Sequence, residues 1–102
     1  MRIVYLGTPA DAVPPLEAIV AAGHEVVLVV TQPDRRRSRG EGTTPSPVRA
    51  AAEALGLRVA TPERSREVVD EVAAREADLG VVVAFGQILP TALLDEIGRA
   101  HV

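Results

Sequence analysis

The sequence predicts an α/β fold: a doubly wound parallel sheet, incomplete at about four strands, with flanking helices. Three observations predict it. Short, valine-rich apolar runs end at turn residues, segments with helical periodicity separate these runs, and 47% hydrophobic content over 102 residues suits one globular domain. Because a helix separates each strand from the next, successive strands are expected to run parallel, joined by right-handed crossovers.

The first third of the chain predicts a β-α-β unit. Ile3–Leu6 is an apolar run closed by Gly7-Thr8-Pro9, and Val26–Val30 is a β-branched run closed by Gln32-Pro33-Asp34. Between them a helix is expected to begin near Pro14, because proline is tolerated only in a first helical turn. Leu16, Ile19 and Val20 are predicted to form its apolar face, and Gly23 is predicted to follow its last turn.

The second helix carries clear boundary signals. Ser46 can cap it, Pro47 fits its first position, and Gly56 follows it. A third short strand is expected over Leu57–Ala60. The apolar face of this helix is predicted to hold Val48, Ala51, Ala52 and Leu55.

The last predicted pair is a charged helix and an apolar strand. The helix is expected around Arg66–Arg75 and the fourth strand over Leu79–Phe85. Gly86 closes that strand, and Pro90 is expected to open another helical turn. The narrow apolar stripe of the charged helix consists of Val68, Val69 and Val72.

Composition excludes several classes of protein. The chain has no cysteine, which rules out disulfides and thiolate metal sites and agrees with a cytoplasmic location. No apolar run approaches the roughly 20 residues that a membrane-spanning helix needs, so no membrane partner is expected. With Tyr5 and Phe85 as the only aromatic residues, any RNA contact is expected to be ionic. No metal is expected, because the lone carboxylates lack a metal-binding spacing: Asp11, Asp70, Asp78 and Asp95.

Three loops are expected to meet at one edge of the sheet. In doubly wound sheets, ligands bind beyond the carboxyl ends of the strands, where Gly7–Asp11, Gln32–Pro45 and Gly86–Pro90 would lie. A surface-loop interpretation explains each loop separately, whereas their convergence favours a site. Gly7-Thr8-Pro9 lacks the further glycines of a dinucleotide fingerprint and the Gly-Lys-Ser/Thr of a P-loop, so a nucleotide cofactor is disfavoured.

The segment Gln32–Pro45, called the arginine loop below, concentrates the basic charge. Its four arginines and two carboxylates give it a charge of +2, which leaves −5 for the rest of a chain whose net charge is −3. Arginine forks suit phosphate binding, and Gly40 and Gly42 would let the loop adapt to a ligand. A solvated charge run is the ordinary alternative, but the loop exceeds the usual length of a βα connection. Its arginines are Arg35, Arg36, Arg37 and Arg39.

The segment that follows the fourth strand suits a planar ligand. Phe85-Gly86-Gln87-Ile88-Leu89-Pro90 combines a backbone-exposing glycine, an amide and aliphatic groups. A strand-end turn followed by a helix start explains the same residues equally well on local grounds.

Three sequence blocks resemble one family. The stretches "RIVYLGTPADAVPPLEAIVAAGHEVVLVVTQPDRRRSRG", "TPSPVR" and "ADLGVVVAFGQILP" occur in the order and spacing of the N-terminal region of methionyl-tRNA formyltransferases. The resemblance extends over roughly Arg2 to Asp95 and implies a Rossmann-like fold. It also implies transfer of a formyl group from 10-formyltetrahydrofolate to the methionine amino group of initiator methionyl-tRNA in translation initiation.

The resemblance implies a role for each loop. The arginine loop would bind the tRNA acceptor stem, with Arg39 at the end of that stem and Arg35 matching the Gln-Pro-Asp-Arg motif. Arg36 and Arg37, inferred from charge, and Gly40 complete the expected tRNA-binding set. The loop after the first strand matches at Gly7, Thr8 and Pro9. The wall of the folate pocket is expected to be Phe85, Gly86, Gln87, Ile88 and Leu89. Among the departures, Glu41 and Gly42 stand where the family commonly has basic residues, which shifts the expected phosphate contacts towards Arg36 and Arg37.

The family's catalytic groups have no counterpart in the sequence, which contains no asparagine and so no Asn-x-His segment. We therefore expect residues 1–96 to be the N-terminal part of the catalytic domain, with the catalytic segment and a C-terminal β-barrel absent. Ile97–Val102 reads as one frame of a common sequencing adapter and is expected to be a non-native tail. The chain alone is expected to be inactive, and the full-length enzyme monomeric.

Two other interpretations remain at this point. A folate-dependent formyl hydrolase or sugar-amine formyltransferase would share the sheet and the pocket, although a small acceptor has no use for a phosphate-binding arm. A non-catalytic RNA-binding module would use the arginine loop alone. Salt-sensitive binding to any RNA, without preference for an acceptor end, would support the second interpretation.

Overall fold

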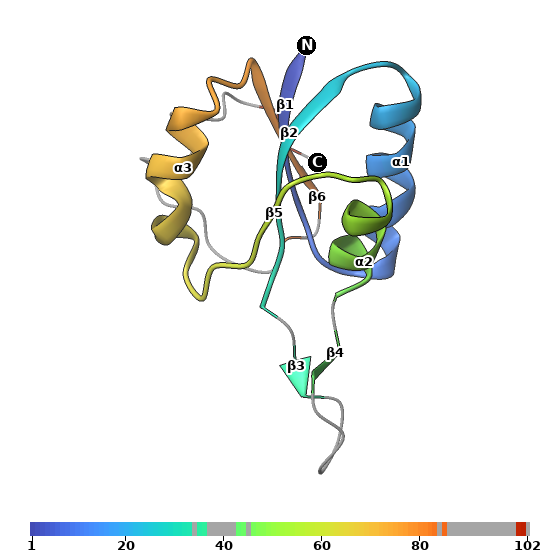
Figure 1. Ribbon diagram of the computed structural model, residues 1–102, viewed down its shortest axis with the longest axis vertical. Coiled ribbons are helices and arrows are strands. Elements are labelled where there is room, and N and C mark those ends of the chain that lie inside the picture. Colours follow the sequence, from blue (N-terminus) through green and yellow to red (C-terminus); the bar gives the residue numbers. More distant parts are fainter. Residues whose placement is uncertain (34, 37–42, 45, 84, 86–99, 102) are drawn as a thin grey trace.

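The computed structural model describes residues 1–33, 35–36, 43–44, 46–83, 85 and 100–101. A five-stranded parallel sheet in the order β5-β2-β1-β6-β7 forms the centre, with α1 and α2 on one face and α3 on the other (Figure 1). The predicted doubly wound α/β class is therefore confirmed. The strands of this sheet are β1 (Arg2–Gly7), β2 (Glu25–Val30), β5 (Val59–Ala60), β6 (Leu79–Val83) and β7 (Ala100–His101).

The sheet grows outward from β1 in both directions. The chain builds β1, β2 and β5 side by side, with α1 and α2 as the crossovers on one face. It then returns across the opposite face through α3 and places β6 on the free edge of β1. The four predicted strands are present, and the two-residue β7 pairs with β6 as a fifth strand.

The first helix begins where its prolines allow. A short 3₁₀ turn, Ala10–Ala12, leads into α1 (Val13–Ala21), which places Pro14 and Pro15 in the first turn, where no intrahelical N–H is required. Gly23 follows with a φ of 91°, the left-handed conformation predicted for a residue that ends a helix. Of the expected apolar face, Leu16 is buried, and Ile19 and Val20 pack at the edge of the core.

The second helix, α2 (Pro47–Ala54), also matches its predicted boundaries. The Ser46 Oγ accepts a hydrogen bond of 3.1 Å from the Arg49 N–H, and Gly56 has a φ of 74°. Val48 and Ala52 are buried against the sheet, but Leu55 is 40% exposed, so its predicted place on the apolar face was wrong. Leu55 is the C-cap residue, where the chain already turns away from the sheet.

The third helical segment is divided. A 3₁₀ turn, Ser65–Val68, precedes α3 (Val69–Ala74), so the α-helical part is shorter than the predicted Arg66–Arg75. The Glu67 side chain accepts a hydrogen bond from the Arg64 N–H at 3.1 Å and closes the start of the turn. Val68 and Val72 are buried on the sheet, as the apolar stripe predicted.

Two strands are shorter than expected, because pairing rather than apolar sequence sets their bounds. Leu57–Ala60 pairs with β2 only through Val59 and Ala60. Leu79–Phe85 pairs with β1 as far as Val83. Phe85 is buried beyond the strand end, and the helical turn expected at Pro90 lies outside the described residues.

The core has one apolar cluster on each face of the sheet. On the α3 face, Leu28 packs with Val68, Val72 and Phe85. On the face of α1 and α2, Tyr5 is fully buried, and its hydroxyl donates to the Ala12 carbonyl at 2.6 Å. That bond satisfies the one polar group that Tyr5 brings into the core.

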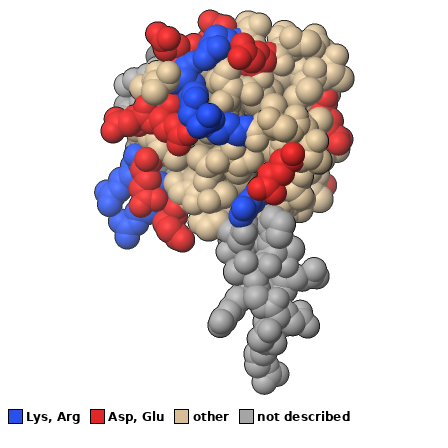
Figure 2. Space-filling model, viewed as in Figure 1, with Lys and Arg blue, Asp and Glu red and all other residues tan. Residues whose placement is uncertain are grey.

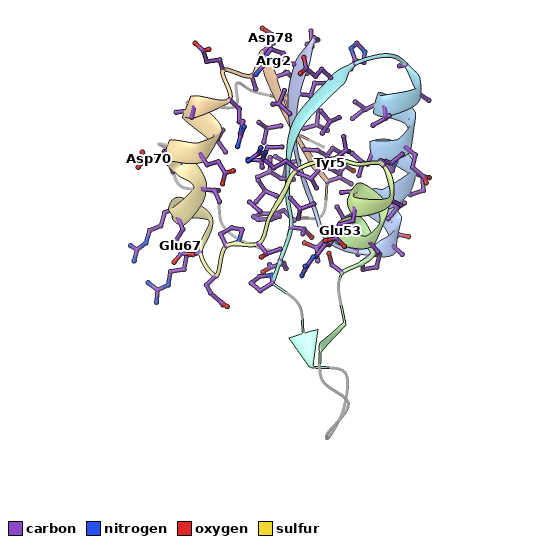
Figure 3. All side chains as sticks on the ribbon, viewed as in Figure 1. Arg2, Tyr5, Glu53, Glu67, Asp70 and Asp78 are labelled. Carbon is purple, nitrogen blue, oxygen red and sulfur yellow. The ribbon has the colours of Figure 1, made fainter. Side chains whose placement is uncertain are left out.

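Arg2 joins β1 to β2 and to the connection between α3 and β6 at the amino edge of the sheet. Its N–H donates to the Asp78 carboxylate at 2.8 Å, and its guanidinium reaches the Glu25 carboxylate at 3.4 Å and the Arg75 carbonyl at 2.5 Å. Arg2 and Asp78 lie together at the amino end of β1, at the opposite end of the sheet from the loops of interest (Figure 3). Among the described residues, no helix has the length and apolar character to cross a membrane.

Tyr5 gives the fold a measurable dependence on alkaline pH. Burial raises the pKa of its hydroxyl from 10.0 to about 12. Between these values the unfolded chain has lost the proton and the folded chain keeps it, so the free energy of unfolding is expected to fall as the pH rises. The slope is at most about 1.4 kcal/mol per pH unit, and stability below pH 10 is unaffected by this group.

The sequence makes this prediction easy to check. Tyr5 is the only tyrosine and tryptophan is absent, so the ultraviolet absorbance of ionised tyrosine reports this one residue. The midpoint is expected near 12 for the folded chain and near 10 in concentrated urea. A folded-state midpoint at 10 would show that water reaches the hydroxyl. Tyr5→Phe serves as the control that removes the signal.

Candidate functional site

The residues that follow β1, β2 and β6 meet at the carboxyl edge of the sheet, where the sequence predicted that three loops converge; of the third loop, Gly86–Pro90 lies outside the described residues. Because β1 lies between β2 and β6, the residues that follow these three strands become neighbours. Thr8 follows β1, Thr31 and Gln32 follow β2, and Phe85 lies just beyond β6. The order in which strands are added to the sheet also reverses here, between β1 and β6, and ligands usually bind at such a point in this class of fold.

Thr8 is the centre of a hydrogen-bonded cluster at this edge. Its hydroxyl donates to the Phe85 carbonyl at 3.0 Å and accepts from the Gln32 N–H at 3.2 Å. The Gln32 side chain donates from Nε2 to the same Phe85 carbonyl at 3.3 Å. All three loop ends are therefore tied together through one hydroxyl and one carbonyl.

Thr31 and Ser46 extend this cluster to α2. Thr31 is fully buried; its Oγ1 lies 2.8 Å from the Ser46 Oγ and 3.5 Å from the Thr8 Oγ1. Since the Ser46 Oγ also caps α2, and the Val48 N–H lies 3.3 Å from the Thr8 carbonyl oxygen, the helix start is fixed against the first loop. We call this set the threonine cluster: Thr8, Thr31, Gln32, Ser46 and the Phe85 carbonyl.

Gly7 allows the first loop to leave the sheet so close to its neighbours. A Cβ at this position would lie 2.9 Å from the Ala12 Cβ and 2.9 Å from the Val83 carbonyl oxygen. Both atoms belong to packed elements, the 3₁₀ turn and β6, so no larger residue fits at position 7 without displacing one of them. Glycine is thus required at this turn because there is no room for a side chain between β6 and the 3₁₀ turn.

The arginine loop begins beside the threonine cluster and continues into a two-stranded antiparallel ribbon. β3 (Arg35–Arg36) pairs with β4 (Thr43–Thr44), with Arg35 opposite Thr44, and the ribbon lies beyond the carboxyl edge (Figure 1). Arg35 and Arg36 therefore share an arm at the edge where Thr8 and Phe85 lie. Other predicted site residues fall outside the described residues: Arg37, Arg39, Gly40, Gly86, Gln87, Ile88 and Leu89.

The described part of this site suits binding better than proton transfer. The threonine cluster offers hydroxyls and one amide, none of which titrates near neutral pH. Within the described parts of the chain, no group of three or more histidine, aspartate or glutamate side chains could hold a metal ion. On the face drawn in Figure 2, arginines lie beside carboxylates over the body of the domain, so basic charge there is largely balanced.

Sequence reasoning predicted the meeting of the loops but missed part of the cluster. Thr8 was predicted as a site residue, whereas Thr31 was not. Gln32 was predicted as the start of the arginine loop and of its Gln-Pro-Asp-Arg motif, and Ser46 only as a helix cap. A signal was present for two of these residues, because Thr31 and Gln32 are the first polar residues after an apolar strand. Such residues lie at the carboxyl edge of a parallel sheet.

A formyl transferase family model and curated formyltransferases match this chain. The family model described as formyl transferase matches residues 1–101. The methionyl-tRNA formyltransferase of Synechococcus sp. (strain CC9605) is 59% identical over 99 residues, and that of Heliobacterium modesticaldum is 58% identical over 96 residues. These alignments cover 94% and 93% of this chain but 29% and 30% of the relatives, so the chain spans less than a third of their length.

Solved structures support the same fold. A phosphoribosylglycinamide formyltransferase from Bacillus halodurans superposes with a TM-score of 0.69 at 14% identity, over 99% of this chain and 54% of its own. Glycinamide ribonucleotide transformylase 1 from Symbiobacterium toebii gives 0.70 at 12% identity, over 99% of this chain and 49% of its own. At these identities the likeness concerns the fold, and it confirms the predicted Rossmann-like sheet.

Proposed function

Because the chain belongs to the formyl transferase family, which matches residues 1–101, we propose that it contributes to transfer of a formyl group onto methionyl-tRNA. The proposed donor is 10-formyltetrahydrofolate, and the proposed acceptor is the methionine amino group of initiator tRNA. The observation that carries the proposal is the sequence identity of 59% and 58% to proteins named methionyl-tRNA formyltransferase. Cytoplasmic location and a monomeric full-length enzyme belong to the same proposal.

In this proposal the arginine loop is the arm that binds tRNA. It begins at the carboxyl edge, forms the β3–β4 ribbon away from the sheet, and carries four arginines in a chain of net charge −3. An arm of this kind suits the phosphates of an acceptor stem, which a small substrate would not offer. Arg39 is the proposed contact at the end of the stem, supported by Arg35, Arg36, Arg37 and Gly40.

The folate pocket is proposed to lie beside the threonine cluster. Phe85 is the described member of the proposed wall, and its carbonyl is fixed by two hydrogen bonds. Gly86, Gln87, Ile88 and Leu89 would continue this wall. Gly7, Thr8 and Pro9 would lie between this wall and the arginine loop, since the Thr8 hydroxyl bonds to the Phe85 carbonyl and to the Gln32 N–H.

RNA binding by the 102-residue chain tests the arm. Replacing the four loop arginines with glutamine is expected to reduce the slope of log affinity against log salt by about 4, and Arg39→Gln alone by about 1, for a hairpin that carries the acceptor stem. The measurement is fluorescence anisotropy across a salt series.

A matched double substitution provides the control. Arg64 and Arg66 are exposed and lie outside the loop, so Arg64→Gln with Arg66→Gln is expected to leave the slope unchanged. If the slope fell equally, per arginine replaced, in the loop variant and in the Arg64/Arg66 variant, a specific arm would be contradicted and a general attraction of the chain to RNA indicated. Equal binding of a hairpin without an acceptor end would favour the non-catalytic RNA-binding module.

We propose that residues 1–102 do not catalyse the reaction by themselves, since the sequence contains no asparagine and so no Asn-x-His segment. Residues 1–96 would be the N-terminal part of a catalytic domain, and 97–102 a non-native tail. A chimera that joins residues 1–96 to the remainder of the Synechococcus relative tests this division. Formylation by the chimera but not by the chain is expected, and formylation by the purified chain would contradict it.

A further inference from the structure

Gln32 contacts the ends of both neighbouring loops. It lies at the base of the arginine loop, three residues before β3 begins. Its backbone N–H donates to the Thr8 hydroxyl at 3.2 Å, while its side-chain Nε2 donates to the Phe85 carbonyl at 3.3 Å. The start of the proposed RNA arm is thus bonded directly to the start of the proposed folate wall.

The Phe85 carbonyl has little freedom to move independently. It accepts one hydrogen bond from the Thr8 hydroxyl and one from the Gln32 Nε2, and together these two bonds use both lone pairs of the carbonyl oxygen. The Phe85 ring is buried on the α3 face with Leu28 and Val72, which fixes the backbone from the other side. A displacement of Gln32 must therefore either break the bond to this carbonyl or move the carbonyl with it.

We propose that Gln32 is a positioning residue that links RNA contact at the arginine loop to the geometry of the folate wall. The inference rests on the proposed function, and it adds a means by which the two substrates affect each other. RNA that rearranges the arm displaces Gln32, which either breaks the bond from Nε2 to the Phe85 carbonyl or moves that carbonyl with it. By reciprocity, a ligand on the folate wall changes RNA affinity by the same factor.

A purely local role would have different consequences. If Gln32 only closed the turn before Pro33, its removal would weaken the loop, the fold and RNA binding together. A positioning role leaves RNA binding in place and removes the response at Phe85. The two roles are therefore separated by a signal at the carbonyl rather than by stability.

The sequence offers a direct probe of that carbonyl. Phe85 is the only phenylalanine, so phenylalanine labelled with carbon-13 at the carbonyl gives one protein signal in the 102-residue chain. In the wild-type chain, the acceptor-stem hairpin is expected to shift this signal in proportion to the bound fraction. In Gln32→Met, which keeps the side-chain length and removes the amide, the free signal is expected to move because one hydrogen bond is lost, and its response to RNA is expected to disappear.

Affinity is measured on the same samples. Gln32→Met is expected to change the RNA dissociation constant by less than the roughly fivefold that marks a substantial coupling. Thr61→Val is the control, since Thr61 is exposed on the loop after β5 at the same edge of the sheet; its Phe85 signal is expected to respond as in the wild type. Gln32→Asn, which keeps the amide but shortens its reach, is expected to behave like Gln32→Met.

Each other result overturns a defined part of the argument. If the wild-type chain does not bind the hairpin, the proposed tRNA-binding role of the arginine loop fails and the link fails with it, whereas the formyl transfer proposed from sequence identity is tested separately by the chimera. If RNA binds but the Phe85 signal does not move, or moves equally in Gln32→Met, the link fails while the proposed function stands. Loss of RNA binding together with the fold in both variants would assign Gln32 a structural role instead.

Discussion

Gly7→Asn is expected to lower the free energy of unfolding by about 4 kcal/mol. A Cβ at residue 7 would approach the Ala12 Cβ and the Val83 carbonyl oxygen to 2.9 Å each, and the Tyr5 ring to 3.2 Å. Val83 is the register partner of Gly7, so relief of the contact requires β6 to move away from β1. The amide would also be buried at a position that has no room for water.

Gly23→Asn is the matched control. Gly23 has a φ of 91°, which asparagine tolerates better than most residues, and apart from its chain neighbours no atom of the described residues lies within 4 Å of a Cβ built at this position. Its expected cost is below about 1 kcal/mol. Urea denaturation followed by circular dichroism measures both. Similar midpoints for the two variants would show that β6 yields easily, and the close approach at Gly7 would then lose its assigned importance.

Leu28→Ala is expected to cost about 3 kcal/mol of the free energy of unfolding. Leu28 is fully buried on β2, an inner strand between β5 and β1, and packs with Val68, Val72 and Phe85 between the sheet and α3. Truncation leaves a cavity lined by strand and helix residues that the rest of the sheet holds in place, so little collapse is possible. Since small domains are stable by about 5–15 kcal/mol, this one change removes a large share.

Leu55→Ala provides the same chemical change at an exposed position. Leu55 is 40% exposed at the end of α2, so its expected cost is below about 1 kcal/mol. The midpoints of urea denaturation compare the two substitutions. Equal losses would contradict the core on the α3 face, whereas a loss confined to Leu28→Ala supports it.

The sequence predicted most of the regular structure because those signals are local. Ser46 before Pro47 specified the start of α2, and the prolines at 14 and 15 specified the start of α1. The bounds of β5 and β6 depended on partners elsewhere in the chain, so apolar runs overestimated their length. The β3–β4 ribbon was missed, since arginines and threonines around glycines carry no alternating apolar pattern.

The sequence was enough to predict at which edge of the sheet the candidate site lies, but not which of its side chains form hydrogen bonds with each other. That the loops after β1, β2 and β6 converge follows from the doubly wound order. That the Thr8 hydroxyl meets the Phe85 carbonyl, 77 residues away in sequence, depends on the exact register of β1 against β6. Thr31 and Ser46 are likewise separated by the whole arginine loop, and no local pattern pairs them.

The sheet order also sets a sequence of events during synthesis. β1, α1 and β2 leave the ribosome first and can pair through nearby contacts, whereas the other edge of β1 must wait for β6, where Ile3 meets Leu79. Closing so long a segment is slow compared with forming a local β-α-β unit. The Thr8 hydroxyl therefore gains its Phe85 acceptor only after β6 has docked, and a nascent chain cannot present the assembled threonine cluster before then.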